Sequence, residues 1–376
     1  MLQATPPPPP PVIERPASHQ VSYGIVEGRA APGARRVVIR VDGLVVERLR
    51  LRGRSFRADL DLPSRELTLR VETIDERGRR AGRSVRNVFG LPRAGRPRNR
   101  TPRFDEQLQR DVRRLAGRFP GTAGIYVENL GTGAGAAWNA RATFPGASTL
   151  KLAIAVALFG RVDGPPAPGT TLDRIMRGML IASDNDAANR ALVYLGGSTS
   201  GGGALVNATM RTIGLERTEM YGGYLLGTAL EPVREPTARG IPMTVISQPA
   251  WGVGKATTAA DLAQLHRAVW LASAGLGPLG RARAGVDPAE ARYVLYLLAH
   301  VQTRSKLARV THTRRGVVVL HKAGWIDAAR HDAGLVVSPQ GIVVAAVMTY
   351  RASGPGRRAD ILAGDVAEAA LRRLRG

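Results

Sequence analysis

Short runs of alternating apolar and polar residues fill the first quarter of the chain. Turn pairs such as Asp42-Gly43 separate these runs, the clearest of which are residues 37–41, 44–46, 55–60 and 66–71. Because successive side chains of a strand point to opposite faces, this alternation predicts strands that each bury one face. Short strands at this spacing predict a small antiparallel β-sandwich over residues 21–92.

After residue 103 the apolar residues follow helical spacing, with strand-like apolar runs near both ends of the region. The predicted helices are residues 104–119, a helix that begins at 148, and 172–181, 184–195, 203–213, 258–272, 288–301 and 359–374. The predicted strands are residues 123–129, 135–139, 316–320, 333–337 and 341–350. Strands on both sides of a helical middle predict an α/β domain, in which one antiparallel sheet is flanked by helices and an inserted all-α subdomain borders a cleft.

Two further segments have compositions typical of connections. Residues 1–20 include the six prolines Pro6–Pro11 and predict an extended, disordered tether. Residues 93–102 are basic and rich in proline and glycine, which predicts a linker. We therefore expect a multidomain chain, with the α/β domain over residues 103–376.

The 376-residue chain carries a formal net charge of +24, which favours anionic partners such as a cell-wall polymer. A specific nucleic-acid partner is not expected, because the arginines are spread along the chain and no nucleic-acid-binding motif accompanies them. No apolar run is long enough to span a membrane. The first residues lack the basic end and the apolar stretch of a signal peptide, so none is visible.

The residues that commonly hold cofactors are missing or isolated in this sequence. The absence of cysteine excludes disulfides, thiol nucleophiles and cysteine-ligated metals. None of the six histidines forms a metal-binding pair at helical spacing, and no phosphate-binding glycine loop precedes a helix. We therefore expect neither a metal nor another cofactor.

Lysine is scarce, since only four of the 54 basic residues are lysines. Arginine stays charged in proteins, whereas burial and neighbouring charge can lower the pKa of a lysine until it acts as a base. Two of the lysines, Lys151 and Lys322, belong to three short motifs that follow one another in the chain. The motifs are Ser148-Thr149-Leu150-Lys151, Ser183-Asp184-Asn185 and Lys322-Ala323-Gly324.

The first motif combines a nucleophile with a base. Ser148 lies at a predicted helix start, where the positive helix end stabilises developing negative charge, and Lys151 follows on the same face. A neutral Lys151 could remove the proton of Ser148 as general base. Taken singly, Ser148 could be a helix cap and Lys151 a surface residue, but the apolar residues after Lys151 predict a buried helix.

The other two motifs supply groups for binding and proton transfer. Ser183 is interpreted as a proton relay and Asn185 as a contact for Lys151 and substrate, while Asp184 could simply cap the next helix. Lys322, which follows the strand predicted at 316–320, would attract a substrate carboxylate and lower the pKa of Lys151.

Gly324 would let substrate approach the strand edge, and the backbone N–H of Trp325 could complete an oxyanion hole with that of Ser148. The adjacent His331 and Asp332 would point to opposite faces of a strand, so we interpret them as structural.

The ordered motifs Ser-x-x-Lys, Ser-Asp-Asn and Lys-x-Gly resemble those of the class A serine β-lactamases and their penicillin-binding relatives over about residues 103–376. The stretches Ser183–Asn189 and Thr257–Asp261 add to this resemblance. It implies a β-lactamase-like fold for this domain and the catalytic roles given above. Separately, Gly28–Ala34 and the Asp42-Gly43 turn resemble bacterial immunoglobulin-like modules, which implies an immunoglobulin-like sandwich at 21–92.

The sequence departs from the family pattern in its spacing, which is shorter from Ser148 to Ser183 and longer from Ser183 to Lys322, and in two of its residues. Ala323 replaces the threonine or serine that is usual in the third motif. The omega-loop glutamate, which activates water to release the acyl-enzyme, has no clear counterpart in the corresponding stretch Thr218–Tyr224. Glu231 is the best substitute for this deacylation base.

The resemblance implies a serine hydrolase of the class A β-lactamase type, which forms an acyl-enzyme at Ser148 with a β-lactam or a peptidoglycan-stem-like D-alanyl amide. Two alternatives stay open: a D-alanyl-D-alanine carboxypeptidase-like penicillin-binding enzyme with slow deacylation, and a non-catalytic protein that binds the cell envelope. The family further implies a monomer in an extracytoplasmic or secreted location.

Overall fold

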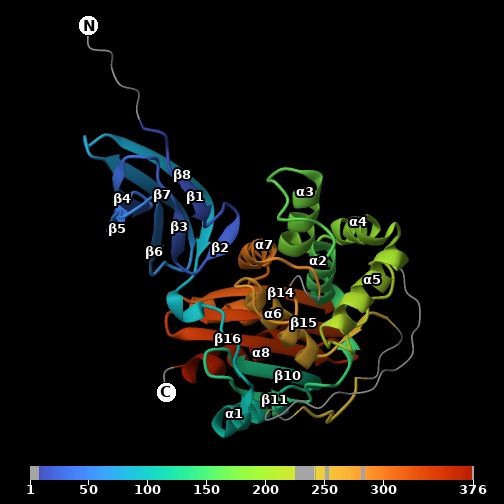
Figure 1. Cartoon of the computed structure of the whole chain (residues 1–376). Coiled ribbons are helices and arrows are strands. Elements are labelled where there is room, and N and C mark those ends of the chain that lie inside the picture. Colours follow the sequence, from blue (N-terminus) through green and yellow to red (C-terminus); the bar gives the residue numbers. More distant parts are fainter. Residues whose placement is uncertain (1–7, 225–240, 242, 250–253, 281–283, 375–376) are drawn as a thin grey trace. The chain divides into compact units, whose positions relative to one another are not determined.

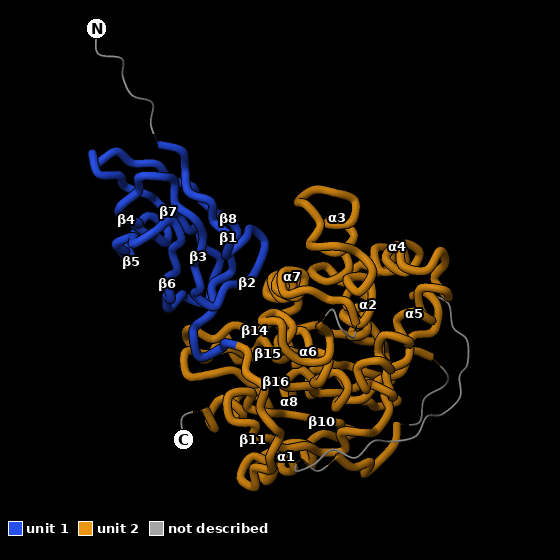
Figure 2. The backbone as a smooth tube through the Cα atoms, viewed as in Figure 1, with its two compact units in different colours: residues 1–96 blue, residues 97–376 orange. Residues whose placement is uncertain are grey.

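The alternating runs of the N-terminal region form two sheets within the first of two units, which comprise residues 1–96 and 97–376 (Figure 2). The structure, a computed structural model, describes residues 8–224, 241, 243–249, 254–280 and 284–374. The three-stranded sheet has the order β1 (Val12–Arg15), β3 (Ile25–Arg29), β6 (Ser55–Asp59). The five-stranded sheet has the order β2 (Gln20–Ser22), β8 (Arg80–Gly90), β7 (Glu66–Asp75), β4 (Ala34–Val41), β5 (Leu44–Arg50).

One hydrophobic cluster joins the inner faces of these two sheets. Val26 and Phe56 of the three-stranded sheet are buried in the same cluster as Ile39, Leu69 and Val71 of the five-stranded sheet. The alternation is clearest in β3 and β6, which bury every second side chain as the pattern predicts. The N-terminal unit is a β-rich unit with its own core.

The predicted tether and linker are both shorter than expected. Ile13 in β1 pairs with Gly28 in β3, and β2 pairs with β8, so residues 12–22 belong to the β-rich unit. At the other end, Arg96 donates through Nε to the carbonyl oxygen of Tyr23 over 3.0 Å, which holds the start of the predicted linker on the same unit. Proline-rich composition did not exclude pairing, because Val12 and Ile13 keep their own backbone N–H groups.

The second unit is built around a six-stranded sheet of order β14-β15-β16-β10-β11-β9 (Figure 1). Its strands are β9 (Arg103–Phe104), β10 (Thr122–Asn129), β11 (Ala134–Trp138), β14 (Val318–Ile326), β15 (Ala329–Ser338) and β16 (Gly341–Tyr350). β10 pairs antiparallel with β16, with Val127 opposite Ala345. This pairing confirms that segments far apart in the chain complete one sheet.

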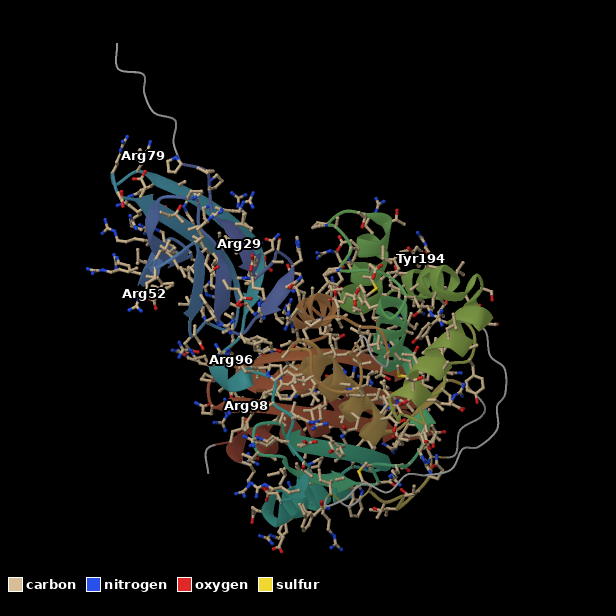
Figure 3. The ribbon with its side chains drawn as sticks, viewed as in Figure 1. Arg29, Arg52, Arg79, Arg96, Arg98 and Tyr194 are labelled. Carbon is tan, nitrogen blue, oxygen red and sulfur yellow. The ribbon has the colours of Figure 1, made fainter. Side chains whose placement is uncertain are left out.

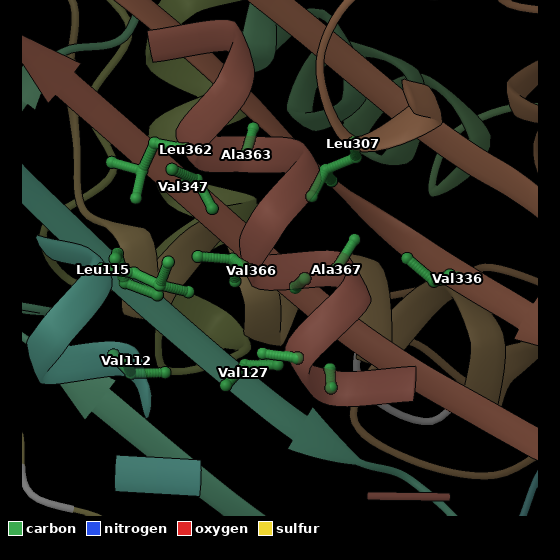
Figure 4. Close-up of a cluster of buried hydrophobic side chains, with 14 of the residues drawn as sticks. Val112, Leu115, Val127, Leu307, Val336, Val347, Leu362, Ala363, Val366 and Ala367 are labelled. Atoms are coloured by element: carbon green, nitrogen blue, oxygen red, sulfur yellow. The ribbon is translucent and has the colours of Figure 1, made fainter. Parts of the chain in front are cut away.

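Helices cover both faces of this sheet. Val366 and Ala367 of α8 (Gly356–Arg372) pack with α1 (Glu106–Gly117) and the sheet residues Val127 and Val347 (Figure 4). On the opposite face, α6 (Ala259–Ala272) contacts β10, β15 and β16, and α7 (Pro288–Ala299) contacts β14. The sheet is therefore buried on both sides, as its nearly continuous apolar strands require.

The remaining α-helices come between β12 (Phe144–Pro145) and β13 (Ala256–Thr257) in the chain. These two short strands pair with each other. The helices are α2 (Lys151–Phe159), α3 (Thr171–Arg177), α4 (Asn185–Gly196) and α5 (Thr199–Thr212). Shorter turns of helix are η1 (Arg93–Gly95), η2 (Ala147–Leu150), η3 (Gly178–Ala182) and η4 (Leu307–His312). Within the described part of the chain, no helix has the length and apolarity needed to span a membrane.

Candidate active site

Ser148 lies in η2, one short turn before α2 begins at Lys151. The helix predicted to start at Ser148 thus starts as a 3₁₀ turn, and its regular part begins three residues later. Every residue of α2 is buried, as the apolar run predicted. Because Lys151 is the first residue of this buried helix, its amine lies 3.0 Å from the Oγ of Ser148 and donates to it.

Lys151 is fully buried and is surrounded by oxygen acceptors. Besides Ser148, its Nζ donates to the carbonyl oxygen of Ser183 over 2.5 Å and to the Oδ1 of Asn185 over 2.7 Å. Burial lowers the pKa of Lys151 to about 8, and the nearby Asp184 carboxylate acts in the opposite direction. A lysine with this pKa is neutral often enough near neutral pH to accept a proton from Ser148.

Ser183 brings its hydroxyl between two amines. Its Oγ lies 2.8 Å from the Nζ of Lys322 and 3.4 Å from that of Lys151, and both amines donate to it. Ser183 ends η3 with a φ of 62°, a left-handed conformation that few residues other than glycine adopt. Asp184 then caps α4 by accepting from the backbone N–H of Ala187 over 3.0 Å, so the capping interpretation of Asp184 is confirmed.

Lys322 lies inside β14, and the prediction that it follows the end of a strand was wrong. The apolar run ends at Leu320, but β14 continues to Ile326 because its backbone stays paired with that of β15. Lys322 is buried, and burial together with the charge of Lys151 lowers its pKa to about 7. We predicted that the charge of Lys322 lowers the pKa of Lys151. The effect runs the other way: the charge of Lys151 lowers the pKa of Lys322, whereas the pKa of Lys151 is lowered by burial.

Gly324 brings the edge strand β14 against the nucleophile. A Cβ on Gly324 would lie 2.9 Å from the backbone nitrogen of Ser148 and 2.8 Å from that of Thr149, so only glycine permits this approach. β14 is an edge strand that pairs with β15 on one side, and it also contacts η2. Trp325 follows, with an exposed side chain whose ring lies 4.8 Å from the Nζ of Lys306.

His331 and Asp332 support the site without entering it. The Nε2 of His331 donates to the carbonyl oxygen of Pro145 over 2.8 Å, just before the Ser148 turn, and burial lowers its pKa to about 4. Asp332 points the other way and lies 2.7 Å from the Nδ1 of His321. The two neighbours therefore lie on opposite faces of β15, as predicted.

Comparison with known proteins agrees with this geometry. A family model described as "Beta-lactamase enzyme family" matches residues 107–165 and 163–374. The chain belongs to this family. Its members include the class A β-lactamases and penicillin-binding relatives that the three motifs resemble, so the serine hydrolase fold of the second unit is established. No curated protein sequence matches the chain.

Solved structures with this β-lactamase-family fold cover most of the chain. The protein PBP-A is 25% identical, with a TM-score of 0.55, and the match covers 73% of this chain and 98% of PBP-A. A β-lactamase from Sphaerobacter thermophilus is 20% identical, with a TM-score of 0.53 and coverage of 72% and 97%. A β-lactamase from Streptosporangium roseum is 17% identical, with a TM-score of 0.54 and coverage of 72% and 99%.

The β-lactamase-family site contains residues that the motifs did not indicate. The Tyr224 hydroxyl donates to the carbonyl oxygen of Ala147 over 3.1 Å, and the Tyr224 ring lies 4.6 Å from the Nζ of Lys151 and 4.9 Å from that of Lys255. The scarcity of lysine in the sequence was a signal for these contacts, because Lys255 is one of only four lysines. Lys151 and Lys322 line the site, while Lys255 and Lys306 contact the rings of Tyr224 and Trp325.

The predicted deacylation base Glu231 lies outside the residues that the structure describes. Within the described part of this region, the backbone of Glu219 pairs with that of Ala256. The structure therefore brings together the residues predicted to form the acyl-enzyme, whereas the role of Glu231 in its release stays a prediction.

Proposed function

We propose that this chain is a serine hydrolase that forms an acyl-enzyme at Ser148 with β-lactams or D-alanyl amides. The observation that carries the proposal is the 3.0 Å contact between the buried amine of Lys151 and the Oγ of Ser148. Ser148 alone is a weak nucleophile, and an adjacent base is the group that activates it.

In the proposed acylation, the Oγ of Ser148 attacks the carbonyl carbon while its proton moves to neutral Lys151. The resulting oxyanion accepts hydrogen bonds from the backbone N–H groups of Ser148 and Trp325. The carbon–nitrogen bond then breaks, and the leaving nitrogen takes a proton from Ser183. Lys151, which now carries the proton of Ser148 and donates to the Oγ of Ser183, replaces that proton. Lys322 keeps its charge and attracts the substrate carboxylate.

Asn185 contacts the general base and is proposed to contact the substrate as well. Its Oδ1 accepts from Lys151, which leaves its amide N–H groups for a carbonyl oxygen of the substrate. A related structure supports the proposal, since the L158E mutant of PBP-A was solved as an acyl-enzyme complex with penicillin G.

Two catalytic outcomes remain, namely rapid release of the acyl group by a β-lactamase and slow release by a carboxypeptidase-like penicillin-binding enzyme. One observation favours slow release: among the described residues, none of the groups hydrogen-bonded to Lys151 is a carboxylate that could activate water.

The test is to incubate the full chain and its Ser148→Ala variant with a fluorescent penicillin and a chromogenic cephalosporin. Turnover of the cephalosporin identifies a β-lactamase, and stable Ser148-dependent labelling identifies a penicillin-binding enzyme. If the folded wild-type protein gives neither result, the hydrolase proposal is wrong.

We also propose that the N-terminal unit is an immunoglobulin-like module that binds an anionic cell-wall polymer, with the chain acting as a monomer outside the cytoplasm. Arginines cover this unit, including Arg29, Arg52 and Arg79 (Figure 3). On the five-stranded sheet, exposed Arg36 lies directly opposite exposed Arg50. Like charges opposite each other destabilise a sheet, and an anionic ligand would relieve this repulsion.

Sedimentation with purified wall polymer tests this second proposal. Changing Arg36, Arg48 and Arg50 together to glutamine should weaken binding, and the loss should resemble that caused by added salt. Changing three arginines of the other unit, Arg98, Arg113 and Arg118, is the matched control. Equal binding by both triple variants would contradict a specific role for this face.

A further inference from the structure

Tyr224 lies beside the nucleophile on the side of Lys151. Its hydroxyl donates to the carbonyl oxygen of Ala147, the residue before Ser148, over 3.1 Å. Its ring centroid is 4.6 Å from the Nζ of Lys151, whose amine contacts the Oγ of Ser148. The phenol ring therefore extends along the Ser148 turn from the general base to the preceding carbonyl group.

The position of Tyr224 is fixed from several directions. The side-chain amide of Asn189 accepts from the backbone N–H of Tyr224 over 2.7 Å and donates to its carbonyl oxygen over 3.2 Å. Lys255 lies against the ring and donates to the carbonyl oxygen of Gly223 over 2.6 Å. With its side chain buried and its backbone held at both polar groups, Tyr224 has no room to move aside within this arrangement.

Hydrolysis of an acyl-enzyme makes definite demands on the surroundings of Ser148. A water must reach the ester carbon and lose a proton to a base, after which the carbon–oxygen bond to Ser148 breaks and the Oγ regains a proton. Among the described residues that contact Tyr224, none is a carboxylate, and the amine of Lys151 is already the base of the proposed acylation. Burial raises the pKa of Tyr224 far above its usual range, so the ring is a neutral phenol, and the amide of Asn189 does not accept protons.

We propose that Tyr224 fills the space beside Lys151 from which water would attack, and that it thereby keeps the acyl-enzyme at Ser148 long-lived. This inference rests on the proposed acylation of Ser148. It attributes the slow hydrolysis of the acyl-enzyme to one side chain. The site has the groups that form the acyl-enzyme, but an aromatic ring occupies the side on which a water and its base would be needed.

The experiment follows the lifetime of the acyl-enzyme separately from its formation. The full chain is labelled with a fluorescent penicillin, chased with excess unlabelled penicillin, and the remaining label is measured over time. Wild-type protein should keep its label. Tyr224→Glu places a carboxylate beside Lys151 and should shorten the label lifetime about a hundredfold, the typical contribution of a general base.

Companion variants separate the ring from its hydroxyl. Tyr224→Ala opens space for water and should also shorten the lifetime, whereas Tyr224→Phe keeps the ring and should leave it unchanged. Tyr194→Glu, at an exposed tyrosine of α4 (Figure 3), is the matched control and should behave as wild type. The melting temperature of each variant shows whether it is folded.

The outcomes distinguish the two proposals. No labelling of folded wild-type protein overturns the acylation proposal and this inference with it. Labelling followed by rapid loss overturns only the role of Tyr224, and if Glu231→Gln then restores a long lifetime, Glu231 is the deacylation base. Unchanged lifetimes in both folded Tyr224→Glu and folded Tyr224→Ala also overturn the role of Tyr224.

Discussion

Two buried amines share one hydroxyl at the centre of this site, because Lys151 and Lys322 both donate to the Oγ of Ser183. The proposed reaction needs them in different states, with Lys151 neutral to accept a proton and Lys322 charged to attract a carboxylate. Burial lowers the pKa of Lys151 to about 8, and burial together with the charge of Lys151 lowers that of Lys322 to about 7. The pair therefore loses its protons near neutral pH, in two coupled steps.

The acylation rate should accordingly show a bell-shaped dependence on pH. Below the lower pKa both amines are charged and Lys151 cannot act as a base, and above the higher pKa both are neutral and Lys322 cannot hold a carboxylate. We expect the maximum between the two values of about 7 and about 8. Labelling rates with fluorescent penicillin across this range test the prediction, and in Lys322→Arg the decline at high pH should disappear because arginine stays charged.

A second residue-scale prediction concerns the base itself. Lys151→Arg keeps a positive charge but cannot provide a neutral amine, so acylation should fall at least about a hundredfold near neutral pH. Lys151→Ala should have a similar effect. Labelling at the wild-type rate by either folded variant would show that another group removes the proton of Ser148.

At the scale of elements, the site depends on the contact between the edge strand β14 and the turn η2. Gly324 makes this contact possible, and His331 of β15 holds Pro145 at the start of the same turn. The β14–β15 hairpin, which is distant in the chain from η2, thus helps to fix the position of the nucleophile. The geometry of this contact limits the reaction, because an oxyanion hole works only when its N–H groups are correctly placed.

Gly324→Ala should therefore impair acylation and lower stability. The added methyl group would meet the backbone nitrogens of Ser148 and Thr149 at less than 3.0 Å, which forces β14 and η2 apart. We expect a destabilisation of about 2 kcal/mol, typical of overpacking, and a reduced labelling rate. Gly117→Ala is the matched control, since nothing lies within 4 Å of the added methyl group. Similar behaviour of the two variants in urea unfolding and labelling would contradict this account of Gly324.

At the scale of the whole molecule, the chain consists of two units that each bury a hydrophobic cluster of their own. The residues of the proposed reaction all lie in the second unit, and the family match begins at residue 107. None of the residues proposed to act on Ser148 or its substrate belongs to the first unit. A separate core for each unit also means that neither needs the other to bury its apolar residues.

A fragment of residues 97–376 should fold and be acylated at Ser148 at the rate of the full chain. The same fragment should lose most of its retention on anionic wall polymer, because the arginines of the five-stranded sheet are removed with the first unit. Circular dichroism, fluorescent labelling and sedimentation test the three parts. A fragment that folds but is acylated much more slowly would indicate that the first unit contributes to the site.

Most element types, the division into an N-terminal β-rich part and an α/β part, and the candidate residues for acylation could be predicted from the sequence alone. Period-two and helical patterns are local, and the spacing of Ser148 and Lys151 within one helical turn fixes their contact without reference to the rest of the chain. Composition was a poorer guide at the boundaries, where β1 and β2 form within a segment predicted to be a tether.

How segments far apart in the chain meet could not be predicted without the three-dimensional structure. The continuation of β14 through Lys322, the approach of Gly324 to Ser148 and the placement of Tyr224 beside Lys151 all depend on contacts between residues far apart in the chain. The family resemblance pointed to the stretch Thr218–Tyr224 as a whole, and only the structure placed the ring of Tyr224 beside Lys151. The physical reason is that pairing and packing between distant segments are set by the whole core, whereas propensity and spacing act over a few residues.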